Sequence, residues 1–137
     1  AMGVVSAEES DRLNIFGATM LAMTLAVEGL CARLGCDPHE VLVDGNLTPH
    51  GRREEWRWAA RPIVGGDAIE PCISAASIIA KEHRDRLMRD YALAHPHYGW
   101  ERNAGYGTPE HLAALREHGP SPLHRRSFAP VAQLELF

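Results

Sequence analysis

Lysine and cysteine are scarce in this sequence, and no apolar run is expected to be long enough to span a bilayer. Lys81 is the only lysine among 14 basic residues, so arginine supplies nearly all of the positive charge. The three cysteines lack the even number and spacing of a disulfide framework, and Cys31 and Cys36 are not spaced as a zinc pair. These absences disfavour a secreted disulfide scaffold. They predict reduced thiols, a cytoplasmic location and no membrane partner.

The charge of the chain is small and unevenly distributed. Its 137 residues carry a formal net charge of −4 and are 45% hydrophobic, which is typical of one globular domain or part of one. Residues 1–50 carry two arginines against seven acidic residues, a net charge of −5, whereas residues 51–137 carry twelve basic against eleven acidic residues, a net charge of +1. By charge alone, an ordinary solvated surface is a better interpretation than a nucleic-acid-binding surface.

A long amphipathic helix is predicted near the start of the chain. The segment from Ser6 to Glu9 has the pattern of a capping box, which marks a helix start. Beyond it, apolar residues recur at spacings of three and four and predict one buried face: Leu13, Phe16, Met20, Met23, Val27, Leu30 and Leu34. Gly35, followed by Asp37 and Pro38, ends the predicted helix.

Two short strands are predicted after this helix. Residues 41–43 form an apolar run directly before Asp44, and residues 61–64 precede a pair of glycines and Asp67. The polar segment 47–60 between them fits either a helical turn or a loop. This order is typical of neighbouring strands in an α/β sheet. Residues 1–5 resemble the end of another strand, and two strands are too few for a covered sheet, so we expect further strands to be missing from this chain.

Helices are predicted over most of the remaining sequence. Residues from Pro71 to about His95 read as one long helix. The residues expected on its packed face are Ala75, Ala76, Ile79, Ala80, His83, Leu87 and Tyr91. Thr108, followed by a proline and an acidic residue, is a well-formed helix start, and Gly119 ends that helix. Ser121 and the proline after it predict the start of another short helix.

Two aspartates follow the predicted strands and are the first candidates for chemistry. Asp44 ends the first apolar run, and Asp67 occupies the analogous place after the second, next to two glycines. Ligands of open α/β sheets bind at the carboxyl ends of strands. A pair of carboxylates there can share a Mg²⁺ or Mn²⁺ ion, because these cations take oxygen ligands. The alternative is that each aspartate caps a helix or a turn.

Basic and aromatic residues in the second half offer a possible nucleic-acid surface. Lys81 and Arg84 are three positions apart and share a helix face, so they can contact the phosphates of one strand. A solvated face with Asp85 and Asp90 as partners explains them equally well. Tyr106 lies in a Gly-Tyr-Gly-Thr segment, which by itself indicates a tyrosine in a glycine loop before a helix cap, packed on the sheet.

Several sequence blocks together resemble one enzyme family. The segment GGDAIEPCISAASIIAKEHRDRLM runs from residue 65, and HYGWERNAGYGTPEHLAALREHGPSPLHRRSFAPV runs from residue 97. In this order they resemble ribonuclease HII, the type 2 ribonuclease H, over nearly all of residues 1–131. The resemblance implies an α/β ribonuclease H-like fold: a mixed sheet flanked by helices, with additional C-terminal helices. The family's opening Asp-Glu-x-Gly-Arg-Gly motif is absent, so we expect this chain to be roughly the last two-thirds of such an enzyme, without its N-terminal strands.

The resemblance also implies an activity and its metal ligands. It predicts metal-dependent hydrolysis of the RNA strand of RNA/DNA hybrids and cleavage 5′ of ribonucleotides embedded in duplex DNA. It assigns Asp44 and Asp67 as catalytic ligands of Mn²⁺ or Mg²⁺. The alternative is a truncated, inactive fragment that retains only nucleic-acid or clamp binding, because half of the family's carboxylates are missing. A third expectation is a misplaced start or a cut chain.

The resemblance further predicts residues that contact nucleic acid or a partner protein. Tyr106 corresponds to a tyrosine that packs on the sugar beside the ribonucleotide, and Asn14 matches a position facing the nucleic acid. Asn103 and Ala104 depart from the family, where a His-Lys pair is common. The last residues, 132–137, are predicted to be a flexible tail, and Gln133, Leu136 and Phe137 there resemble a sliding-clamp-binding motif.

Overall fold

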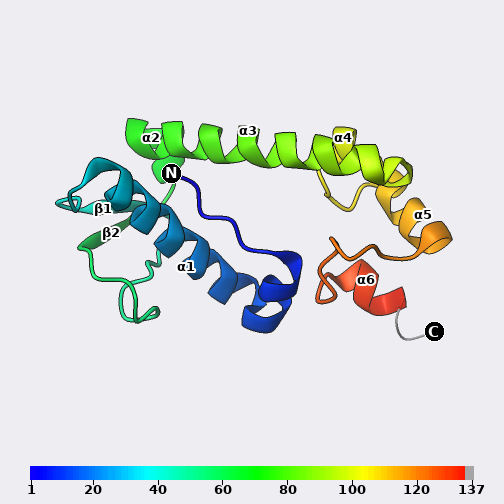
Figure 1. Ribbon diagram of the computed structural model, residues 1–137, viewed down its shortest axis with the longest axis horizontal. Coiled ribbons are helices and arrows are strands. Elements are labelled where there is room, and N and C mark those ends of the chain that lie inside the picture. The colour runs from blue at the N-terminus through cyan, green and yellow to red at the C-terminus, as the bar shows by residue number, and fades with distance from the viewer. Residues whose placement is uncertain (135–137) are drawn as a thin grey trace. The chain divides into compact units, whose positions relative to one another are not determined.

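The computed structural model describes residues 1–134, which divide into two compact units, residues 1–78 and the residues from Ile79 onward. Figure 1 shows the elements along the chain. Their order is α1 (Ala7–Leu34), β1 (Val41–Asp44), β2 (Ala60–Ile63), α2 (Gly66–Ile69), α3 (Pro71–Ala94), the 3₁₀ helix η1 (Pro96–Tyr98), α4 (Trp100–Asn103), α5 (Pro109–His118) and α6 (Ala129–Leu134). The mixture of a small parallel sheet with several helices confirms the α/β class and is consistent with a ribonuclease H-like fold.

The sheet of the first unit consists of two parallel strands in the described residues. β1 pairs with β2 so that Val41 lies opposite Ala60 and Asp44 opposite Ile63. Each strand is four residues long, and the second begins one residue earlier than the sequence predicted. Because parallel strands place their carboxyl ends at the same edge, the residues that follow β1 and β2 are brought near each other.

An irregular loop held by two tryptophans joins the two strands. Segment 47–60 contains turns up to the start of β2, so of the two interpretations the structure supports the loop. Trp56 and Trp58 are buried and meet edge to face, with ring centroids 5.3 Å apart. The Trp56 indole donates to the carbonyl of Trp58 at 2.8 Å, and the Trp58 indole donates to Asp37 at 3.0 Å. Their burial and hydrogen bonds hold a loop that has little regular structure.

The predicted ends of α1 are confirmed, but the helix is interrupted near its start. Ser6 caps the helix by accepting from the Glu9 amide at 3.1 Å, and Gly35 closes it in the left-handed conformation. Asn14 has φ 57° and ψ 168°, outside helical values. Its side-chain oxygen accepts from the amide of Gly17 at 3.0 Å, so it acts as an N-cap for the longer second part of the helix.

The predicted buried face of α1 is largely wrong. Of the apolar stripe only Met20 is buried, and Phe16, Leu30 and Leu34 are exposed. The helix is apolar around much of its circumference, so periodicity alone did not identify the side that packs. α1 is also long and apolar enough to cross a membrane by length and composition, with 22% of its most apolar window buried. This corrects the expectation that no such run exists; core helices and signal sequences pass the same test.

α3 has the predicted extent but packs on a different side. Ala75, Ala76, Ile79, Ala80 and Tyr91 of the predicted face are exposed, and His83 and Leu87 are only partly buried. The buried residues of the helix are instead Ile73 near its start and Ala92 near its end, with Met88 partly buried beside the second core. The predicted face failed because alanine and isoleucine occur around the whole first half of α3.

The second unit has its own core, built around aromatic and histidine side chains. Its buried apolar residues are Ala92, Tyr98, Trp100, Ala114, Leu115 and Val131. Tyr98 and Trp100 stack with centroids 4.9 Å apart, and the Tyr98 hydroxyl donates to the Gly119 carbonyl at 2.7 Å. These contacts pack η1 and α4 against α5, so the chain between α3 and α5 is anchored from both sides.

The boundaries of α5 match the sequence analysis, whereas the next predicted helix is absent. Thr108 caps α5 by accepting from the His111 amide at 3.3 Å, and Gly119 follows its last residue. The helix predicted from Ser121 is wrong: residues 121–124 form a turn in which the His124 amide donates to the Ser121 carbonyl. Nδ1 of His124 accepts a hydrogen bond from the Ser121 amide and lies within hydrogen-bonding distance of the Ser121 hydroxyl. These local side-chain contacts compete with helix formation.

Candidate active site

Asp44 and Asp67 lie at the same edge of the sheet. Asp44 is the last residue of β1, and Asp67 lies in the first turn of α2, which follows β2. Oδ1 of Asp44 accepts a hydrogen bond from the amide of Gly66, the residue before Asp67, at 2.8 Å. The structure therefore brings the two predicted ligands together as neighbours.

Two glycines make this close approach possible. Gly65 has φ 67°, a left-handed conformation that lets the chain turn from β2 into α2. A Cβ atom on Gly66 would lie 2.6 Å from Cδ1 of Ile73 and 3.4 Å from Oδ1 of Asp44. A side chain at position 66 would therefore displace Ile73 and touch the Asp44 carboxylate.

The chemistry of the pair fits a hard divalent cation. Both aspartates are exposed, and within residues 1–134 neither forms an ion pair with a basic side chain. Asp44 uses one oxygen for the Gly66 amide and keeps the other for a ligand. Mg²⁺ is often bound by one or two carboxylates completed by water and phosphate oxygens. In the described residues no group of three or more potential metal-binding side chains gathers, so the fit is to a site that substrate or further ligands would complete.

Lys81 is paired within its own helix. Its ammonium group forms an ion pair with Asp85, one turn later on α3. This hydrogen bond is the main cause that raises the pKa of Lys81 and lowers the pKa of Asp85. The Lys81 side chain is nevertheless mostly exposed. The predicted phosphate contact therefore competes with Asp85, as the solvated-face interpretation expects.

Arg84 and Tyr106 meet across the second unit. The guanidinium carbon of Arg84 lies 4.8 Å from the centroid of the Tyr106 ring, which is a cation–π contact. Tyr106 is 67% exposed, so its ring stands at the surface with Arg84 beside it. Two residues that the sequence placed 22 positions apart are thus combined into one aromatic and basic surface.

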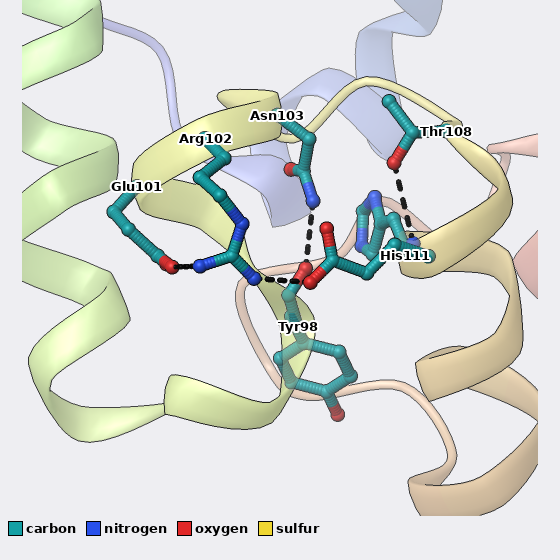
Figure 2. A network of polar contacts seen from close by, with 7 residues as sticks. Tyr98, Glu101, Arg102, Asn103, Thr108 and His111 are labelled. Carbon is teal, nitrogen blue, oxygen red and sulfur yellow. Dashed lines mark hydrogen bonds and ion pairs between the residues drawn. The ribbon is translucent and has the colours of Figure 1, made fainter.

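The backbone of the Tyr106 loop is fixed from both sides. Buried Asn103 donates to the carbonyl of Tyr98 at 2.7 Å, as Figure 2 shows, and its side-chain oxygen accepts from the Gly105 amide at 2.9 Å. The Tyr106 amide donates to the Asn103 carbonyl at 2.9 Å. The Tyr106 carbonyl in turn accepts from the Thr108 amide at 2.8 Å and lies 2.9 Å from Nδ1 of His111. The exposed ring is therefore carried by a rigid turn.

Three buried polar residues support this turn, and sequence reasoning identified only one of them. Asn103 was noted only as a departure from the family pattern, and His111 was not assigned to the site. His124 belongs to a His-Arg-Arg block that resembles the family and was interpreted as structural support or backbone contact. All three are polar residues at buried positions, with 6%, 1% and 9% of their surface exposed, and the structure is what reveals this burial. No sequence pattern distinguishes a buried histidine from one on the surface of α5.

The remaining predicted contacts stay predictions. Asn14 is exposed, but its side chain serves as a helix cap, as described above. Gln133 is exposed near the end of α6, while Leu136 and Phe137 lie outside the described residues. The predicted boundary after residue 131 falls within α6, which ends at Leu134.

Comparisons with known proteins agree with the resemblance. The family model described as Ribonuclease HII matches residues 2–131. A Ribonuclease HII of Novosphingobium aromaticivorans is 83% identical over 138 residues, which cover 99% of this chain and 70% of that protein. Those of Erythrobacter litoralis and Sphingopyxis alaskensis are 68% and 63% identical, and the match covers 64% of each. The chain thus spans about two thirds of the length of these relatives, and it belongs to the ribonuclease HII family.

Proposed function

We propose that this chain carries part of the active site of a type 2 ribonuclease H. The proposed reaction hydrolyses the RNA strand of RNA/DNA hybrids and cuts 5′ of ribonucleotides embedded in duplex DNA. The observation that carries it is the placement of Asp44 and Asp67 at one sheet edge, linked through the Gly66 amide, in a chain of this family. The biological role that follows is removal of RNA primers and misincorporated ribonucleotides.

Asp44 and Asp67 are the proposed ligands of Mn²⁺ or Mg²⁺. When bound, such ions activate water and stabilise the leaving oxygen of a phosphodiester. Asp44 contributes its free oxygen, and its other oxygen accepts from the Gly66 amide, which restrains the rotation of the carboxylate. Asp67 contributes from the start of α2, where the left-handed turn at Gly65 aims the chain back toward β1.

Tyr106, Arg84 and Lys81 are the proposed nucleic-acid contacts. The exposed Tyr106 ring offers an apolar face to a sugar, and a site that senses the 2′-hydroxyl distinguishes RNA from DNA. Arg84, beside that ring, is placed to contact a neighbouring phosphate. Lys81 is a weaker candidate because Asp85 already neutralises it. Asn14 is kept as a further proposed contact.

The test is a cleavage assay on the chain itself. The chain is incubated with Mn²⁺ or Mg²⁺ and a labelled duplex containing one ribonucleotide, in parallel with Asp67→Asn and Asp44→Asn. The proposal expects cleavage 5′ of the ribonucleotide that either substitution abolishes. Cleavage that survives both substitutions would refute the assignment of the two ligands.

A second candidate function is binding without cleavage. It is favoured by the donor count, since residues 1–134 contain no group of three or more acidic, histidine or cysteine side chains that could hold a metal ion. A two-metal centre needs more ligands than two carboxylates supply. A folded sample that binds the ribonucleotide-containing duplex but does not cleave it in either Mn²⁺ or Mg²⁺ would support binding without cleavage.

We also propose a partner and a location. Gln133, Leu136 and Phe137 are the proposed contacts with a sliding clamp, which deletion of residues 133–137 tests through clamp affinity. An unchanged affinity would remove the proposal. The cytoplasm is the proposed location, in agreement with three cysteines that are free thiols in the structure. A tagged chain recovered with the membrane fraction would contradict it.

A further inference from the structure

A chain of hydrogen bonds runs through the second core and ends at the backbone of Tyr106. The Ser121 amide donates to Nδ1 of His124 at 3.0 Å. Nε2 of His124 lies 3.0 Å from Nε2 of His111. Nδ1 of His111 lies 2.9 Å from the carbonyl oxygen of Tyr106. These groups, from Ser121 to the Tyr106 carbonyl, are called the histidine relay below.

The fixed donors and acceptors at the two ends determine which nitrogen carries each proton. A backbone amide can only donate, so Nδ1 of His124 is an acceptor and its proton lies on Nε2. Nε2 of His111 must then accept, and it is also the acceptor of the Trp100 indole at 3.2 Å. The proton of His111 is left on Nδ1, where it donates to the Tyr106 carbonyl. All four groups are satisfied in only this arrangement of two neutral rings.

The surroundings keep His124 neutral at ordinary pH. Burial, reinforced by the neighbouring His111, lowers the pKa of His124 to about 4. The titratable rings that face it are His111 from α5 and His95, His97 and Tyr98 from the segment before α4.

The relay acts on the one exposed aromatic ring of the proposed site. The Tyr106 carbonyl accepts from both the Thr108 amide and His111, which fixes the orientation of the peptide plane that follows Tyr106. The direction of the ring depends on that backbone, because the ring itself stands at the surface beside Arg84 and is not enclosed by the core. A loosened carbonyl would let the loop rotate without disturbing the packed core beneath it.

We infer that His111 and His124 are positioning residues which, through the Tyr106 carbonyl, set the orientation of the Tyr106 ring and so its discrimination of a ribonucleotide from a deoxyribonucleotide. The second half of this inference rests on the proposed function. Its first half concerns the chain alone and needs no nucleic acid.

The relay is tested first by nuclear magnetic resonance of the ¹⁵N-labelled chain at neutral pH. The expected result is an Nδ1–H tautomer for His111, an Nε2–H tautomer for His124 and altered Tyr106 backbone and ring signals in His111→Gln and His124→Gln. His118→Gln is the matched control, because it changes another histidine of α5 that is outside the relay. The opposite tautomer at His111, or Tyr106 signals that His124→Gln leaves unchanged, would overturn the inference. If a variant fails to fold, the wild-type tautomers still decide it.

Discrimination is tested by the ratio of the affinities for two duplexes, one containing a single ribonucleotide and one all-DNA, measured in Ca²⁺. His111→Gln and His124→Gln should each lower this ratio about tenfold, as expected for a lost buried hydrogen bond, and Tyr106→Ala should match them. His118→Gln should leave it unchanged. Folded relay variants with the wild-type ratio would overturn the inference. A wild-type chain without any preference would instead refute the proposed function, while the tautomers and Tyr106 signals still judge the relay.

Discussion

The two units of the chain hold their polar groups in opposite ways. In residues 1–78 the proposed metal ligands are exposed, and one hydrogen bond joins the Asp44 carboxylate to the amide of Gly66, the residue before Asp67. In the second unit the exposed Tyr106 ring is carried by a loop whose backbone is held by Asn103, His111 and Thr108. Carboxylates meant to bind a cation need free oxygens, whereas a side chain that recognises shape needs a fixed backbone. The first unit therefore keeps carboxylate oxygens accessible to a ligand, whereas the second unit holds the backbone of its exposed aromatic residue in a fixed conformation.

The largest expected effect is a loss of stability when the core of the second unit is disrupted. Leu115 is 1% exposed in the second core, so Leu115→Ala should lose apolar contacts and leave a cavity. We expect destabilisation of about 3 kcal/mol or more, measured by urea unfolding. Leu93→Ala, at a position that is 85% exposed, is the control and should change little. Equal losses for the two variants would mean that the second core does not stabilise the chain.

The second effect is a pH dependence that belongs to the second unit. The pKa of His124 is lowered to about 4 from 6.5, so below pH 6.5 the unfolded chain takes up the proton that the folded chain excludes. Stability should therefore be full above pH 6.5 and fall as the pH drops toward 4, by about 3 kcal/mol at most. Melting curves across this range check it. In His124→Gln the loss of stability at low pH should be smaller by this amount. A loss as large as that of the wild type would contradict the assignment of this pH dependence to His124.

A smaller effect should appear at the open site of the first unit. Asp44→Asn and Asp67→Asn keep the shape of each side chain but remove its charge, so each should weaken Mn²⁺ binding about tenfold or more with little change in stability. Isothermal titration of the chain with Mn²⁺ measures this. Asp90→Asn, on α3, is the control. Variants that bind as tightly as the wild type would place the cation elsewhere.

The smallest expected effect concerns an exposed ion pair on the surface of α3. The Lys81–Asp85 pair joins an exposed ammonium group to a carboxylate within one helix, and such pairs add little to stability because water screens them. Lys81→Gln should therefore barely shift the melting temperature. Its effect on duplex affinity should also be smaller than that of Arg84→Gln, because Asp85 already occupies the ammonium group. A larger loss for Lys81→Gln would show that the ion pair opens when nucleic acid binds.

Local features were predictable from the sequence, and contacts between distant segments were not. Ser6 and Thr108 cap their helices as predicted, because a cap depends on residues three positions away. The place of the two aspartates at one sheet edge was also predictable, since Asp44 ends β1 and Asp67 comes shortly after β2. The buried faces of α1 and α3 were not, because both helices carry apolar residues on several sides.

The histidine relay illustrates the limit most clearly. His111 and His124 are 13 positions apart, and their pairing depends on the turn at Ser121, where the sequence predicted a helix. The break at Asn14 was missed for a related reason: its side chain caps the helix that it interrupts.

The tryptophans are divided between the two units. Trp56 and Trp58 are packed edge to face in the loop between the strands, and Trp100 lies among the histidines of the second core. If Trp56 and Trp58 are replaced with phenylalanine, indole fluorescence comes from the second unit alone. If Trp100 is replaced instead, it comes from the first unit alone. The chain thus contains two separate optical reporters, and the superposition or separation of their unfolding curves would reveal whether both units melt in a single cooperative step.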